Sequence, residues 1–313
     1  MLLKKLLIPG TALLLLASCD KNDSKPGIIV AKESYILPGD TLFPEGIAYQ
    51  PATGAFFTGS VTSGDIIKGD VQTGQAASWA AGAAQGRKAA TGLRLDGKNH
   101  LWVCGGDDAK ISVLDASGAL LKMWDMKALF GAGFINDVTS DGTYMYFTDS
   151  RVQKIYRATI ADVPSVMEEW LTFSNTQIPY EATGTNANGI VITGDNKYLI
   201  VVISTSGKLY RINITDKSIM EIPINDPVRN GDGMVLDGTK LYVSRNAMNM
   251  VYPVTLSAAF DNGTVGMPFG TNIKFGTTMA KIGNYLLIVN GQLDKRATRT
   301  QTTPFTLTRV SIP

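Results

Sequence analysis

Four side chains that carry oxygen ligands share a short sequence context. They are Glu45, Asn136, Asn188 and Asp232, in the segments Pro-Glu-Gly-Ile, Ile-Asn-Asp-Val, Ala-Asn-Gly-Ile and Gly-Asp-Gly-Met. Two carboxylates and two amides are ligands that a hard cation such as Ca²⁺ prefers, and two carboxylates neutralise a divalent charge. A zinc site is excluded, because the chain has one histidine and two cysteines.

The context recurs six times, and this repetition indicates which fold must bring the four residues together. With Thr91 and Thr278 included, successive equivalent positions are 44 to 52 residues apart. This spacing is the length of one four-stranded propeller blade. A two-sheet sandwich also has many short strands, but it does not predict one pattern repeated six times. We therefore predict an all-β fold, a six-bladed β-propeller with four-stranded blades around a central channel.

Local patterns within each unit agree with this prediction. An apolar run is followed by a hairpin turn, such as Asp141-Gly142 or Asp237-Gly238, and then by a β-rich run. No stretch after residue 27 shows a sustained helical period. We expect residues 28–36 and 305–312 to share the last blade, because this closure leaves only short, protected sheet edges.

Asn-Gly and Asp-Gly are also common turn dipeptides, which offers a purely structural interpretation of the four positions. Each unit, however, already has its hairpin turn some five residues later, and Glu45 follows a proline in a sequence that is no turn signal. In a propeller the innermost strand of every blade starts near the channel, so equivalent positions form a ring on one face. The hypothesis is a cation site of Glu45, Asn188 and Asp232, with Asn136 nearby.

The N-terminal segment has the features of an export signal. Residues 1–18 combine Lys4 and Lys5 with an apolar run too short to span a bilayer. The following Leu-Ala-Ser-Cys resembles the lipobox of bacterial lipoproteins and predicts acylation of Cys19. An ordinary signal peptide with an incidental cysteine is the alternative. We expect residues 19–27 to form a flexible tether and residues 28–313 the single propeller domain, held at a cell-envelope membrane, periplasmic or outer surface, by the lipid anchor only.

The charge balance excludes one class of partner. The formal charge of the 313-residue chain is +2, and removal of an export segment with Lys4 and Lys5 leaves a mature protein without net charge. Such a protein has no basic field to hold a phosphate backbone, so we expect no nucleic-acid partner.

In order and spacing, Glu45-Gly46, Asn136-Asp137, Asn188-Gly189 and Asp232-Gly233 resemble the pattern of the gluconolactonase, senescence marker protein and luciferin-regenerating-enzyme family of six-bladed propellers. The resemblance covers almost all of the mature chain. It implies one divalent cation, usually calcium, bound by Glu45, Asn188 and Asp232. It also implies that Asn136 contacts substrate and that Asp232 is the general base. Sugar-lactone members often carry an arginine two residues before the blade-three asparagine, and this chain departs from them with Phe134.

The ring of oxygen ligands and the resemblance together predict metal-dependent hydrolysis of a small-molecule lactone or ester. We expect the protein to be a monomer. The cation polarises the carbonyl, and Asp232 takes a proton from the attacking water. The alternative is a non-catalytic, surface-tethered binding propeller with a structural calcium in its channel. An open coordination position that faces a cavity favours the enzyme.

Overall fold

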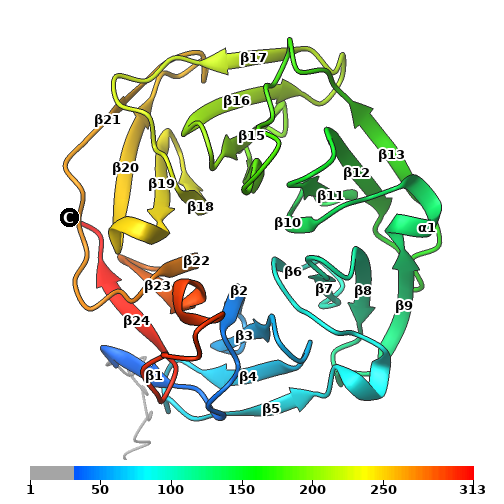
Figure 1. The fold of residues 1–313 in the computed structure, drawn as a ribbon, viewed down its shortest axis with the longest axis vertical. Helices are drawn as coiled ribbons and strands as arrows, with labels where there is room; N and C mark the ends of the chain where they lie inside the picture. The colour runs from blue at the N-terminus through cyan, green and yellow to red at the C-terminus, as the bar shows by residue number, and fades with distance from the viewer. Residues whose placement is uncertain (1–31) are drawn as a thin grey trace, which may run out of the picture. The chain divides into compact units, whose positions relative to one another are not determined.

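Six sheets of four antiparallel strands stand around a central channel (Figure 1). The computed structural model describes residues 32–313, and the predicted six-bladed propeller is confirmed. The predicted export signal (1–18), the tether (19–27), Cys19 and the predicted start of the domain at residue 28 lie outside the described residues.

In blades one to five the strands follow the sequence from the channel outward. Blade one has β2 (Pro44–Gln50), β3 (Ala55–Ser60), β4 (Ile66–Asp70) and β5 (Ala76–Ala80); blade two has β6 (Leu93–Leu95), β7 (Leu101–Cys104), β8 (Lys110–Leu114) and β9 (Leu120–Asp125). Blade three has β10 (Ile135–Ser140), β11 (Tyr144–Asp149), β12 (Lys154–Thr159) and β13 (Met167–Thr172); blade four has β14 (Ala187–Ile192), β15 (Tyr198–Ile203), β16 (Lys208–Asn213) and β17 (Ile219–Ile222). Blade five has β18 (Gly231–Asp237), β19 (Lys240–Arg245), β20 (Met250–Leu256) and β21 (Gly263–Val265).

Blade six combines the two ends of the described chain. Its strands are β22 (Gly276–Ile282), β23 (Tyr285–Asn290), β24 (Thr306–Ser311) and, outermost, β1 (Ser34–Ile36), which pairs with β24. The expected sharing of the last blade is therefore confirmed for residues 34–36, and residues 28–31 lie outside the described part. In Figure 1 the first and last strands lie side by side.

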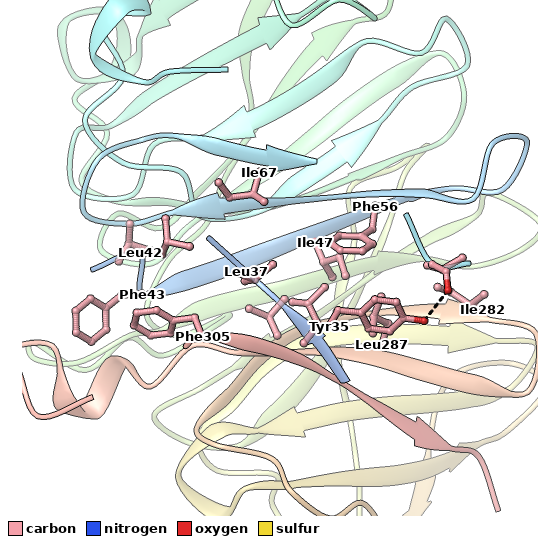
Figure 2. Close-up of a cluster of buried hydrophobic side chains, with 14 of the residues drawn as sticks. Tyr35, Leu37, Leu42, Phe43, Ile47, Phe56, Ile67, Ile282, Leu287 and Phe305 are labelled. Atoms are coloured by element: carbon pink, nitrogen blue, oxygen red, sulfur yellow. Dashed lines mark hydrogen bonds between the residues drawn. The ribbon is translucent and has the colours of Figure 1, made fainter. Parts of the chain in front are cut away.

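A cluster of buried apolar side chains fixes this closure (Figure 2). Tyr35 of β1 packs edge-on against Phe56 of blade one, with ring centroids 5.6 Å apart, and its hydroxyl donates to the Val71 carbonyl at 2.9 Å. Phe43 packs in the same way against Phe305, at 5.2 Å. The first strand thus pairs with blade six while its side chain packs on blade one.

Burial explains which runs become which strands. The second strand of a blade is covered on both faces, so β15 reads as the continuous apolar run Tyr-Leu-Ile-Val-Val-Ile. The outermost strand faces solvent, and β17 has only its last residue fully buried. The second strand of each blade is therefore easier to recognise in the sequence, as an apolar run, than the outermost strand.

Helices are short in the described part. They are α1 (Met126–Phe130) and three 3-10 segments, Ala83–Gln85, Asn246–Met248 and Leu293–Lys295. α1 was not expected, because a helix of little more than one turn produces no periodic pattern; Asp125 caps it by accepting from the Ala128 N–H. Within residues 32–313, no helix has the length and apolar character needed to cross a membrane.

The six innermost strands close the ring by contacting one another in blade order: β2, β6, β10, β14, β18, β22 and again β2. Blade four therefore stands opposite blade one, and blade six opposite blade three (Figure 1).

Candidate functional site

A β-bulge at the start of the innermost strand places each of the four predicted site residues. In blade one the Cα pairs are Pro44 with Ser60 and then Ile47 with Thr58, so two residues of β2 face one residue of β3. The same irregularity occurs in blades three, four, five and six. Such a bulge interrupts regular pairing and redirects a side chain, here toward the channel.

The bulge corrects one predicted position. Glu45, Asn136, Asn188 and Asp232 are each the first residue of their bulge, and in blade six that residue is Thr277. The predicted Thr278 is the second residue. Thr277 and Thr278 are both threonines, so the sequence alone does not show which of them is the first residue of the bulge.

The glycine that follows three of these residues serves close packing between blades. A Cβ on Gly189 would lie 2.2 Å from the Asp232 carbonyl oxygen, and one on Gly46 would lie 2.0 Å from the Thr91 carbonyl oxygen. Both glycines lie within strands, and neither has a positive φ. The turn interpretation of these dipeptides is therefore wrong: the glycines admit the backbone of the next blade.

The structure brings the four predicted residues together. Glu45, Asn136, Asn188 and Asp232 line one cavity of about 710 Å³ at one end of the channel, and each is only 3 to 5 % exposed. They come from blades one, three, four and five. Their assigned roles stay predictions, because the structure shows their positions and not their activity.

Hydroxyl groups of neighbouring blades fix the backbone beneath these side chains. Thr277 Oγ1 donates to the Glu45 carbonyl at 2.7 Å, Thr148 Oγ1 to the Asn188 carbonyl at 2.8 Å, and Thr91 Oγ1 lies 3.0 Å from the Asn136 carbonyl oxygen. The Asn136 amide is also oriented, since its Nδ2 donates to Ser150 Oγ at 2.8 Å. This bond holds the Asn136 side chain where it lines the cavity and leaves its Oδ1 oxygen free of that interaction.

Asn246 is a site residue that sequence reasoning did not assign. It follows β19, lines the cavity, and donates from Nδ2 to Asp232 Oδ2 at 3.2 Å. A signal for it existed, because a polar residue recurs at or just after the end of the second strand in three other blades: Ser60, Ser150 and Ser204. Of these, Ser204 also lines the cavity.

The two site carboxylates each keep an oxygen without a hydrogen bond. Glu45 Oε2 and Asp232 Oδ1 are buried and have no partner among the described residues. Burial is the largest cause that raises the pKa of Glu45 well above its usual value, and the neighbouring Asp232 and Asp137 add repulsion. Burial likewise raises the pKa of Asp232 to about 7, although the Asn246 and Asn188 amides act to lower it.

Asp137 is a third buried carboxylate near Glu45 and Asp232, although it does not line the cavity. Its Oδ1 accepts from the Val138 N–H at 2.8 Å and its Oδ2 from the Ile190 N–H of the next blade at 3.1 Å. Burial nevertheless raises its pKa to about 6, against those bonds and the attraction of Arg94. Arg94 lines a separate hollow formed by later residues of the innermost strands, at the other end of the channel.

The residues fit a hard divalent cation. Two buried carboxylate oxygens lack partners, and the Asn136 and Asn188 amides offer further oxygen ligands beside them. In residues 32–313 no group of three or more His, Cys, Asp or Glu side chains is arranged to hold a metal ion. Any such ion at this site would therefore need the amide oxygens as well as the carboxylates.

Comparison with known proteins supports the fold. No protein-family model matches the chain, and no curated protein matches it. Among solved structures, the major allergen of Malassezia sympodialis is 12% identical over 90% of this chain and 96% of that chain, with a TM-score of 0.66. The calcium-binding protein regucalcin from Agrobacterium tumefaciens is 16% identical over 90% and 96%, with a TM-score of 0.64. A gluconolactonase from Xanthomonas campestris is 14% identical over 88% and 87%, with a TM-score of 0.61.

Identities this low show a shared fold and leave activity to be argued from the site. The chain is accordingly similar to gluconolactonase and regucalcin structures in having the same six-bladed propeller fold that the sequence resemblance implied.

Proposed function

We propose that this protein is a divalent-metal-dependent hydrolase, with Ca²⁺ as the cation, that acts on a lactone or an ester. One observation carries the proposal: two partnerless carboxylate oxygens and two amides converge at the buried end of a cavity large enough for a small molecule. The cation would be held by Glu45, Asn188 and Asp232. The similarity to structures described as a calcium-binding protein and a gluconolactonase supports the same proposal.

Charge balance favours a divalent ion. Glu45, Asp232 and Asp137 interact with one another, and Arg94 is the cation that acts on Asp137. Three carboxylates and one guanidinium leave two negative charges when all are ionised. A divalent cation would neutralise these charges and lower the carboxylate pKa values, against the burial that raises them.

The chain's own residues provide the rest of the chemistry. When bound, the cation would polarise the substrate carbonyl and offset the negative charge that develops on its oxygen. Asn136, fixed by Ser150, would orient the substrate through Oδ1. Asp232, fixed at Oδ2 by Asn246, would accept a proton from the attacking water. The water oxygen forms the new C–O bond, the ester C–O bond breaks, and the proton passes to the leaving oxygen, giving an acid and an alcohol.

The test is hydrolysis of a panel of lactones and aryl esters by the mature protein, with calcium and with EDTA. We expect activity that EDTA abolishes and calcium restores.

Asp232→Asn distinguishes a general base from a residue that only binds the cation. At saturating calcium the variant should remain slower by about 10²-fold or more, because an amide cannot accept the proton. Wild-type turnover at saturating calcium would contradict the base role.

A calcium-loaded wild type that hydrolyses no member of the panel would contradict the hydrolase. That result favours the non-catalytic binding propeller.

Asn246→Ala is a second variant of the site, because it removes the Nδ2 donor to Asp232 and keeps both carboxylates. We expect it to reduce turnover more than calcium affinity.

We also propose that the protein is exported and anchored as a monomeric lipoprotein through Cys19, with no nucleic-acid partner. The support is the N-terminal sequence and the absence of net charge in the mature chain. Labelled palmitate should be incorporated into the wild type expressed in a bacterial host and not into Cys19→Ala. Equal labelling of both proteins would contradict acylation at this residue.

A further inference from the structure

Two phenylalanines that line the cavity belong to no part of the core. Phe134 and Phe275 both face the cavity and are half-buried. In the described residues, neither is a member of any of the six buried apolar clusters. Their apolar surface is therefore not explained by folding alone.

The repeat places these two side chains on opposite sides of the channel mouth. Each lies two residues before the first residue of its bulge, Asn136 in blade three and Thr277 in blade six. Blades three and six stand opposite each other in the ring. Ala89, at the equivalent place in blade two, also lines the cavity. At this repeat position the residues that line the cavity are Ala89, Phe134 and Phe275, and none of their side chains can form a hydrogen bond.

The backbone at Phe275 adds an independent observation. Its φ is 49°, in the left-handed region that is unfavourable for a bulky side chain. In blade five the equivalent residue is Asn230, a type that tolerates this conformation. In blade one it is Phe43, whose burial and contact with Phe305 offset the cost. The ring of Phe275 is only half-buried and lies in none of the described apolar clusters, so its packing offsets less of this cost.

The backbone of Phe275 and the ring of Phe134 each have one further contact. The Phe275 N–H donates to Asn249 Oδ1 at 2.5 Å. The guanidinium carbon of Arg151 lies 5.3 Å from the Phe134 ring centroid, and Arg151 pairs with Asp107 at 2.6 Å. Arg151 does not itself line the cavity. An apolar ring therefore separates this arginine from a ligand.

We propose that the substrate is an ester or lactone with an apolar substituent, aromatic or branched alkyl, which lies between Phe134 and Phe275 while its carbonyl faces Asp232. This inference rests on the proposed hydrolase function. Hydroxyl groups of a polyhydroxylated sugar lactone placed between these two rings would lose water without gaining partners, although polar residues such as Lys88, Asp107 and Arg296 also line the cavity.

The experiment compares δ-phenyl-δ-valerolactone with glucono-δ-lactone in calcium-loaded wild type and two variants, Phe134→Ala and Phe275→Asn. Binding of the corresponding lactams, which are not hydrolysed, is measured by calorimetry as a readout separate from turnover. We expect the phenyl compounds to be preferred. Each variant should weaken phenyl lactam binding and phenyl lactone kcat/KM on the order of 10-fold or more, and leave the glucono compounds nearly unchanged.

Phe275→Asn has a second signature. Asparagine tolerates the left-handed backbone, so this variant should melt at a higher temperature than the wild type while it binds the phenyl lactam less well. A purely packing role predicts the reverse change in melting temperature. Phe134→Leu keeps an apolar side chain and should retain most of the phenyl preference, which guards against a folding defect in Phe134→Ala.

The outcomes separate the two proposals. Phenylalanine-dependent binding of the phenyl lactam without hydrolysis of any lactone would overturn the hydrolase and keep the apolar site. Hydrolysis with equal losses for both substrates in the variants would overturn the apolar site and keep the hydrolase. Tighter binding of the glucono lactam than of the phenyl lactam would also overturn the inference.

Discussion

Glu45 and Asp232 each retain a buried carboxylate oxygen that accepts no hydrogen bond from the described residues, at a cost to the folded state. An unpaired buried carboxylate is unfavourable, and Glu45 and Asp232 also repel each other. A structural role would be served as well by an apolar pair of similar volume. Polar groups kept in this way are expected where a ligand completes them, which is the argument for a cation at these two residues.

The same two residues predict an unusual dependence of stability on pH. In the cation-free protein the pKa of Asp232 is raised from 3.8 to about 7, and that of Glu45 is also raised. A group with a raised folded-state pKa stabilises the fold below its unfolded pKa, and this contribution is lost as pH rises through the folded value. With EDTA, the melting temperature should therefore fall from about pH 4 to above about pH 7.

Calcium should reverse this loss at high pH, because it binds the ionised carboxylates. Melting curves at about pH 5 and about pH 8, with EDTA and with excess calcium, measure both effects. The double variant Glu45→Gln, Asp232→Asn removes both titrations and should give a flatter profile without calcium rescue. A profile unchanged by the double variant would assign the pH dependence to another group, with Asp137 the first to examine.

At the scale of the strand, the bulge and the glycine after it act together. The bulge aims the first residue at the channel, and the missing Cβ at the second residue lets the next blade approach closely. The repeat spacing was sufficient to predict the blades, their turns and the meeting of four polar residues at one cavity, while the roles of those residues stay predictions. It could not predict Thr277 over Thr278, because pairing register depends on the partner strand, which the sequence pattern does not specify.

The remaining site residues were missed for a related reason. Asn246 reaches Asp232 from a 3-10 segment after β19, and Phe275, which lines the cavity, has a left-handed backbone. Neither conformation has a periodic signature. Asp137 stood beside a predicted residue, but its interaction with Glu45 and Asp232 depends on burial that only the closed ring creates.

Gly189→Ala tests the close approach of blades four and five. The new Cβ would lie 2.2 Å from the backbone oxygen of Asp232, so β18 must shift. We expect a loss of about 1 to 3 kcal/mol in the free energy of unfolding and a weaker calcium affinity, because β18 carries Asp232. Urea unfolding and calcium titration measure the two effects.

Gly194→Ala is the matched control in the same blade. A Cβ there meets no atom within 4 Å, and the φ of Gly194 is not positive. It should leave both stability and calcium affinity nearly unchanged. Equal effects of the two substitutions would refute the close-packing role that we assign to Gly189.

At the scale of the whole molecule, the site depends on the seam where the ring closes. Glu45 lies in blade one, and its carbonyl accepts from Thr277 and Thr278 of blade six. The same two blades are joined by β1, which pairs with β24 and packs Tyr35 on blade one. Residues far apart in the sequence thus share one seam, and opening it should displace a cation ligand.

This dependence gives the last prediction, made with two truncated proteins and one point variant. A protein that starts at Lys32 keeps β1 and should unfold like the mature protein. A protein that starts at Pro38 lacks β1, and its blade six has three strands, so we expect a much lower melting temperature and weaker calcium binding. Tyr35→Phe removes only the donor to the Val71 carbonyl and should cost about 1 to 3 kcal/mol, since that oxygen stays buried. Equal melting temperatures and calcium affinities for the two truncated proteins would show that the ring closes without β1, and the link between seam and site would then have to rest on Thr277 and Thr278.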